Sequence, residues 1–156
     1  MVARNSAAPK SAERELVITR VFDAPRELVW RAWTEPAAAV KWWGPKGFTV
    51  PDYKTDSRPG GAWRVCMRSP EGEDHWAHGV YREIVAPERL VFTYAFEDAT
   101  GKPGHETLVT VTFAELGEKT KLTVHQAVFE SVTVRDEHVR GWTEALDRLA
   151  GYLTQV

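Results

Sequence analysis

Hydrophobic and polar residues alternate along most of the chain from Phe48 to Gln126. In residues 62–68, for example, the apolar side chains alternate with Arg64, Cys66 and Arg68. A period of two is typical of a β-strand with one buried and one solvent-exposed face. Turns rich in glycine and proline separate these runs, and a β-branched run precedes them. The pattern predicts strands at residues 15–22, 48–55, 62–68, 75–85, 89–96, 107–114 and 119–126.

Helices are predicted between the first two strands and after the last one. Proline suits the first turn of a helix, and it opens predicted helices at residues 25–33 and 36–43, the second of which stops at Gly44-Pro45. A helix of about six turns follows near the C-terminus, with Thr133 as its N-cap in a variant of the capping box. Its apolar stripe has helical spacing and consists of Val139, Trp142, Leu146, Leu149 and Leu153.

The order of these elements predicts an α+β domain. A curled antiparallel sheet of about seven strands needs apolar cover on its concave face, and the long C-terminal helix is the only predicted element large enough to supply it. The two short helices that follow the first strand close one end. We expect a meander with the first and last strands at its two ends, where they can also pair with each other.

Composition limits the size of the fold and the classes of partner. With 156 residues the chain can form one domain with a substantial core, expected at residues 14–156 after a flexible tail at residues 1–13. The net charge of −2 argues against a nucleic-acid-binding protein, and no window is long and apolar enough for a membrane span. Cys66 is the only cysteine, which excludes an intrachain disulfide and favours a cytoplasmic location.

Five short segments together carry a resemblance to a known family. They are residues 20–30 (RVFDAPRELVW), 42–45 (WWGP), 59–61 (PGG), 79–90 (GVYREIVAPERL) and the closing helix with 141–142 (GW) and 146–149 (LDRL). Over about residues 14–154 the chain resembles the START-like (SRPBCC) superfamily. More narrowly, it resembles homologues of the activator of the heat shock protein 90 ATPase. The resemblance implies the helix-grip fold, and it implies binding of hydrophobic or amphipathic small molecules, polyketide cyclase activity or assistance to a chaperone.

Strand phase predicts which side chains surround a ligand beneath the closing helix. Inward positions alternate with charged or hydroxylated ones, so the face that carries Trp63 and Phe113 should meet the helix. The opposite phase of the fifth strand, with Val91, Thr93 and Ala95 inside, is the alternative. The predicted ligand-binding residues are Trp63, Val65, Met67, Phe92, Tyr94, Val109, Val111, Phe113, His138, Gly141 and Trp142.

Some of these positions carry a more specific expectation. Tyr94 and His138 combine an apolar body with a polar tip, so they are the expected polar contacts of a ligand. Gly141 lies inside a predicted helix, where glycine costs about 1 kcal/mol relative to alanine. Its two interpretations are close packing on the sheet and an opening for a ligand. Trp42 and Trp43 form either an exposed patch or, as helical spacing favours, a pair with one ring buried.

The leading hypothesis is a domain that binds a hydrophobic or amphipathic small molecule, with the stress response as one setting. A polyketide cyclase or hydratase in the same cavity and a co-chaperone-like interaction module are the alternatives. No catalytic residue is assigned, because few ionisable residues face inward. His75 and His78 lie three apart in a strand and point to opposite faces, so no metal and no cofactor are expected. A chaperone and a second copy of the chain remain open as protein partners.

Overall fold

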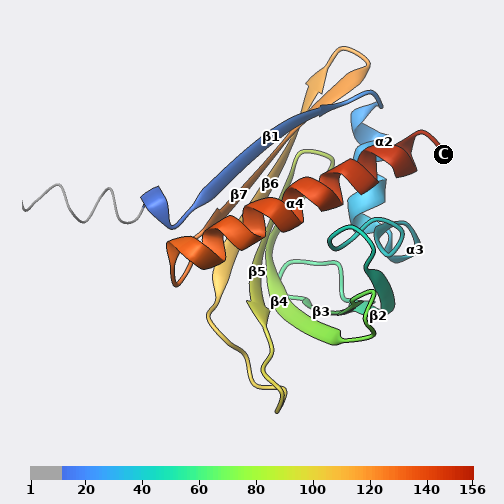
Figure 1. Cartoon of the computed structure of the whole chain (residues 1–156). Helices are drawn as coiled ribbons and strands as arrows, with labels where there is room; N and C mark the ends of the chain where they lie inside the picture. The colour runs from blue at the N-terminus through green and yellow to red at the C-terminus, as the bar shows by residue number, and fades with distance from the viewer. Residues whose placement is uncertain (1–11) are drawn as a thin grey trace, which may run out of the picture.

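Seven antiparallel strands form one curled sheet in the computed structural model, which describes residues 12–156 (Figure 1). Their order across the sheet is β1-β7-β6-β5-β4-β3-β2, so the first strand pairs with the last. The predicted α+β helix-grip fold is confirmed, whereas most of the expected tail at residues 1–13 lies outside the described residues. The strands are β1 (Leu16–Phe22), β2 (Thr49–Thr55), β3 (Ala62–Arg68), β4 (Asp74–Val85), β5 (Arg89–Phe96), β6 (Thr107–Leu116) and β7 (Lys119–Ala127).

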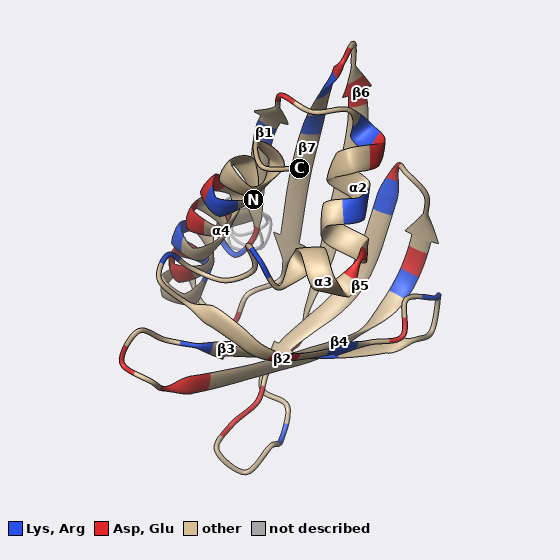
Figure 2. Cartoon of the chain, turned by 90° about the vertical axis from the view of Figure 1, so that its right-hand side faces the viewer, with Lys and Arg blue, Asp and Glu red and all other residues tan. Residues whose placement is uncertain are grey.

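Helices cover the concave face of this sheet and close one of its ends. Helix α4 (Val132–Leu153) crosses the concave face, and α2 (Arg26–Thr34) and α3 (Pro36–Ala39) lie beside the C-terminal half of α4 (Figure 1). In the view of Figure 2, β2, β3 and β4 run across the picture, whereas β5, β6 and β7 run upward, so the sheet bends between the two groups of strands. The sheet therefore wraps around the helices, as the apolar stripe of α4 requires.

The start of α4 differs from the prediction. Ser131, in an extended conformation, accepts a hydrogen bond from the backbone N–H of Val134 at 3.1 Å, so the N-cap is Ser131 and not Thr133. Phe129, two residues earlier, is fully buried and its N–H donates to the carbonyl of Arg14 at 2.8 Å. This contact ties the segment that precedes α4 to the chain before β1.

Helix α3 is shorter than predicted. It ends at Ala39 rather than at residue 43, and the following residues form a turn. Trp42 leaves the helical direction because its side chain is fully buried and its indole N–H donates to the carbonyl of Ala32 at 3.0 Å. Gly44 follows with a φ of 95°, a left-handed conformation that favours glycine.

The core between α4 and the sheet is largely aromatic. The ring of Trp33 lies 4.9 Å from Trp42, 5.7 Å from Trp43 and 5.8 Å from Trp142, measured between centroids. Trp42 is fully buried and Trp43 is half-buried against this cluster, so the pair does not form an exposed patch. Along the predicted stripe of α4, Val139 is half-buried and the other four residues are buried.

Charged residues of both signs are interspersed over α4 and the strands (Figure 2). No helix of the described part of the chain combines the length and hydrophobicity needed to cross a membrane. Within residues 12–156, His, Cys, Asp and Glu side chains do not gather in groups of three or more that could hold a metal ion.

Candidate functional site

Two neighbouring cavities lie on the concave side of the sheet. The larger, named here the α4 cavity, has a volume of about 230 Å³, somewhat below the roughly 300–1,000 Å³ of typical small-molecule sites. The smaller, named here the inner cavity, has a volume of about 30 Å³, little more than the space that a single water molecule needs. Trp43 lines both cavities, so its half-buried indole ring is a shared wall.

The predicted ligand-binding residues divide between these cavities. Met67, Tyr94, His138, Gly141 and Trp142 line the α4 cavity. The size of this cavity makes it the candidate ligand site. The other cavity-lining members of the predicted set surround the inner cavity, and they are Trp63, Val65 and Phe92.

Three predicted residues of β6 line neither cavity. Val109 and Val111 are fully buried, and Phe113 is 2% exposed. The ring of Phe113 lies 5.1 Å from Trp30 and 6.0 Å from Trp33, both on α2. These side chains do face inward, but α2 fills the space in front of them, so they are packed core rather than cavity wall.

The structure also resolves the phase of β5. The ring of Trp63 lies 5.8 Å from Phe92 and 5.3 Å from Tyr94, which puts both β5 rings on the concave face. The alternative phase, with Val91, Thr93 and Ala95 inside, is wrong. Those three side chains are nevertheless buried as well, so burial alone does not distinguish the two faces of this strand.

Four aromatic rings, called here the aromatic wall, line the α4 cavity. Trp43 and Trp142 are 5.4 Å apart at an interplanar angle of 81°, and Tyr94 and Phe96 are 5.4 Å apart at 82°. Trp43 and Phe96 were absent from the predicted set. Phe96 continues the alternation of Phe92 and Tyr94 and could have been found by extending it, but nothing in the sequence around Trp43 indicates that it reaches the cavity.

The rim of the α4 cavity combines residues of α4 with a loop. Glu137 and Ala145 line it from positions four residues before and after Gly141, on the same face of the helix. That spacing is visible in the sequence and could have predicted them. Gly44 and Pro45 line the opposite side. Their proximity to α4 arises from the tertiary fold alone.

Two contacts from α4 hold this loop in place. A guanidinium nitrogen of Arg148, Nη1, lies 3.1 Å from the carbonyl oxygen of Trp43 and 3.0 Å from those of Gly44 and Pro45. The backbone N–H of Lys46 donates to the carboxylate of Glu144 at 3.1 Å. The rim is therefore fastened to the same helix that supplies the other side of the cavity.

The hydrogen-bonding capacity of the two polar side chains in the α4 cavity, His138 and Tyr94, follows from their surroundings. Nδ1 of His138 lies 3.0 Å from the carbonyl oxygen of Val134. Because a carbonyl oxygen only accepts, Nδ1 carries the hydrogen, and Nε2 of the neutral ring is a hydrogen-bond acceptor. Burial raises the pKa of Tyr94, which keeps its hydroxyl uncharged. The cavity therefore offers an imidazole acceptor and a neutral phenol.

A buried amide fixes the position of the Trp142 ring. The indole N–H of Trp142 donates to Oε1 of Gln126 at 2.8 Å, and the amide nitrogen of Gln126 donates to the hydroxyl of Thr107, also at 2.8 Å. Gln126 is fully buried. Since both of its polar ends are paired, the amide orients the aromatic ring without leaving an unpaired polar group in the core.

Gly141 leaves space rather than allowing close packing. A Cβ added there would meet only Cγ of Pro45 within 4 Å, at 4.0 Å. Close packing of the helix backbone on the sheet would have placed atoms much nearer. Of the two interpretations of this glycine, the structure supports an opening above the aromatic wall.

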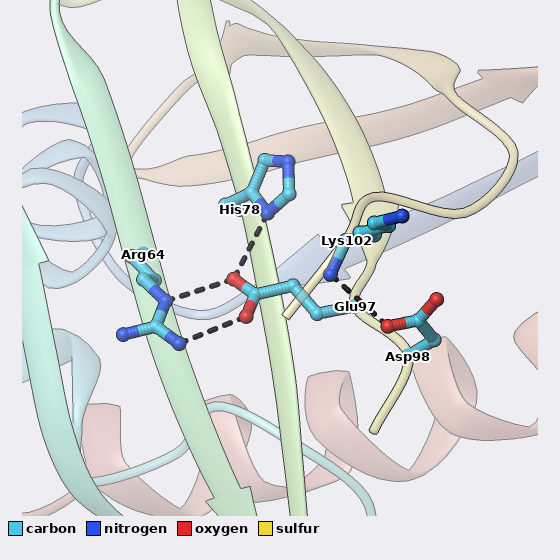
Figure 3. A network of polar contacts seen from close by, with 5 residues as sticks. All are labelled: Arg64, His78, Glu97, Asp98 and Lys102. Carbon is cyan, nitrogen blue, oxygen red and sulfur yellow. Dashed lines mark hydrogen bonds and ion pairs between the residues drawn. The ribbon is translucent and has the colours of Figure 1, made fainter. Parts of the chain in front are cut away.

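A separate polar network lies on the other face of the sheet (Figure 3). Both carboxylate oxygens of Glu97 lie 2.8 Å from donors of Arg64, and one lies 2.9 Å from Nδ1 of His78. The Arg64 hydrogen bonds lower the pKa of Glu97 to about 2, although burial opposes the shift. Nearby, the backbone N–H of Lys102 donates to Asp98 at 3.0 Å and closes a turn. Because Arg64 has the opposite strand phase to the cavity-lining residues of β3, this network lies outside both cavities.

The comparisons with known proteins agree with this architecture. Residues 23–154 match the family described as Activator of Hsp90 ATPase homolog 1-like protein. A solved structure from Chromobacterium violaceum is 31% identical, with a TM-score of 0.81 over 88% of this chain and 95% of that one. An AHSA1 protein from Silicibacter pomeroyi is 26% identical, with a TM-score of 0.84 over 90% and 98%. A protein from Nitrosomonas europaea is 27% identical, with a TM-score of 0.78 over 92% and 96%.

Among curated proteins, none matches the chain significantly. The family match nevertheless spans nearly all of the described residues, from just after β1 to the last turn of α4. It includes every residue that lines the α4 cavity. The chain therefore belongs to the Activator of Hsp90 ATPase homolog 1-like family, within the START-like superfamily.

Proposed function

We propose that the chain binds a hydrophobic or amphipathic small molecule in the α4 cavity. Membership of the family supports a ligand-binding domain in general. The observation that carries the proposal is Gly141, where α4 leaves open space above the aromatic wall. Apolar walls with one or two polar tips, here Tyr94 and His138, are typical of small-molecule sites.

The same cavity chemistry favours binding over catalysis by a cyclase or hydratase. Such an enzyme needs an acid and a base that converge on the reacting atoms. The raised pKa of Tyr94 keeps its hydroxyl protonated at neutral pH, so no phenolate is present to act as a base, and Glu137 is exposed on the rim. Among the residues that line the cavity, His138 is then the one remaining candidate for proton transfer, and a single group does not supply an acid and a base. An interaction module, in turn, would be expected to fill the space beneath α4 with its own side chains.

Titration with a neutral fluorescent dye tests the proposal. N-phenyl-1-naphthylamine gains fluorescence in an apolar environment, so its affinity for the wild-type protein can be measured directly. A leucine at position 141 would occupy the α4 cavity, and we expect Gly141→Leu to weaken dye binding by at least about tenfold. Gly151→Leu is the matched control, because Gly151 lies on the same helix and a Cβ there meets nothing within 4 Å.

Circular dichroism establishes that each variant is folded. Both substitutions replace a helical glycine, so each should leave the helix intact or stabilise it. Unchanged dye affinity in a folded Gly141→Leu protein would place the binding site elsewhere and refute the proposal. An equal loss in Gly151→Leu would attribute the effect to the helix rather than to the cavity.

A further inference from the structure

The aromatic wall brings four rings to one small space. The rings of each of its two pairs are nearly perpendicular, so the edge of one ring meets the face of the other. The face of an aromatic ring carries partial negative charge and attracts cations, and sets of such rings recognise quaternary ammonium groups. A purely hydrophobic ligand would make no use of this electrostatic property.

The formal charge among the residues that line the α4 cavity has the same sign as the face of an aromatic ring. Glu137 is the one residue with a formal charge among those that line it, and the lining contains neither lysine nor arginine. A second carboxylate, Glu144, lies on the rim, where it accepts the hydrogen bond of the Lys46 N–H. The guanidinium of Arg148, on the same helix, is directed at backbone carbonyls of the loop.

The imidazole beside the aromatic wall can accept a hydrogen bond from a ligand. Because Nδ1 of His138 donates to Val134, its Nε2 has a lone pair available for a ligand N–H when the ring is neutral. Ring faces, a carboxylate and an imidazole lone pair all favour positive charge. Together they distinguish the α4 cavity from a cavity that is merely apolar.

We propose that the α4 cavity selects an organic cation, a quaternary or protonated amine carried on an apolar body. This inference rests on the proposed function and adds the charge of the ligand to it. The cationic head contacts the aromatic wall, with Glu137 at the rim as its counter-charge. Anions of the same shape are disfavoured by both features.

Three probes of one shape and different charge test the selection. They are (3-hydroxyphenyl)trimethylammonium, its neutral carbon analogue 3-tert-butylphenol and the anion 3-hydroxybenzenesulfonate, titrated by calorimetry at pH 7. Water solvates the ammonium more strongly than the tert-butyl group, so an apolar cavity without electrostatic selection would bind the neutral compound more tightly. We expect the cation to bind at least about fivefold more tightly than the neutral compound, and the anion most weakly.

Variants separate the two sources of the preference. Glu137→Gln should weaken binding of the cation about threefold or more and leave the neutral compound unchanged. Asp136→Asn is the matched control, because Asp136 is an exposed carboxylate on the same helix, bound to Arg135 at 2.7 Å and outside the cavity lining. Phe96→Leu keeps an apolar side chain but removes a ring face, and it should reduce the preference for the cation over the neutral compound.

The outcomes distinguish this inference from the proposed function. Suppose that Gly141→Leu weakens binding of the naphthylamine dye but the cation binds no more tightly than 3-tert-butylphenol. The proposed selection for a cation is then wrong, and the proposed function stands. Tightest binding of the sulfonate would overturn the selection in the same way. If neither the dye nor any of the three probes binds, both proposals are wrong.

Discussion

Replacing Arg148 with methionine should loosen the loop that forms the rim of the α4 cavity. In the structure Nη1 of Arg148 lies within 3.1 Å of three carbonyl oxygens, those of Trp43, Gly44 and Pro45. Nη1 has two hydrogens, so at most two of these bonds reach full strength, and hydrogen bonds to charged groups contribute about 1.5–3 kcal/mol each. Partial burial lowers the pKa of Arg148, which shows that desolvation of the guanidinium opposes this gain. The net loss should be about 2 kcal/mol.

Urea denaturation and dye titration measure the two consequences. Methionine keeps the apolar stem of arginine, so Arg148→Met removes the hydrogen bonds without removing much packing. We expect a loss of about 2 kcal/mol in the free energy of unfolding, or roughly 4–8 °C in melting temperature. Dye binding in the α4 cavity should weaken as well, because the released residues line it. Arg148→Lys, which retains a charge and three donors, should lose about half as much.

Arg140→Met provides the matched control for this prediction. Arg140 is exposed on the same helix, and substitution at such a position should change the free energy of unfolding by less than about 0.5 kcal/mol. An Arg148→Met protein with the stability and dye affinity of the Arg140→Met control would refute the reasoning. It would mean that the loop holds its position without the guanidinium.

Two further substitutions test the networks on either side of the sheet. Glu97→Gln should lower the free energy of unfolding by about 1–2 kcal/mol at pH 7, a figure reduced because Arg64 is half exposed. The hydrogen bonds of Arg64 lower the pKa of Glu97 from 4.5 to about 2, so the stabilisation is lost as pH falls through this range. Urea titrations should therefore show a smaller difference in the free energy of unfolding between Glu97→Gln and wild type at pH 3 than at pH 7. A larger difference at pH 3 would contradict the lowered pKa of Glu97. Trp142→Phe removes the donor to Oε1 of the buried Gln126 and should cost about 2–3 kcal/mol, whereas wild-type stability would show that this bond contributes nothing.

The fold could be predicted because its determinants are local. Period-two alternation and the proline-opened helices define nearly every element, and a seven-strand sheet with one long apolar stripe has few ways to cover its concave face. The errors fall where tertiary contacts override local signals. Thr133 and Ser131 are both suitable N-caps, and in the fold it is Ser131, two residues after the buried Phe129, that caps the helix. The second short helix ends early because Trp42 is drawn into the core.

The candidate site was harder to predict, since strand phase identifies inward positions but not the space in front of them. Tyr94 and Phe113 are equivalent in the pattern, and both face the concave side. Tyr94 borders the α4 cavity, whereas Trp30 and Trp33 fill the space before Phe113. Trp43, which lines both cavities, comes from a loop whose position depends on contacts made by α4.

Two glycines show why the same sequence signal has opposite meanings in the finished fold. At Gly79 in β4, a Cβ would overlap the carbonyl oxygen of Thr93 and lie 2.7 Å from the indole nitrogen of Trp63, so the missing side chain is space that the protein itself fills. At Gly141 in α4, a Cβ would meet only Pro45 at 4.0 Å, so the space is left unfilled. Glycine is intrinsically unfavourable in both a strand and a helix. Only the atoms around each position show whether the missing side chain allows close packing or leaves an opening. Of these two positions, only the one on α4 has room beside it for a further group, which is the space that the proposed ligand requires.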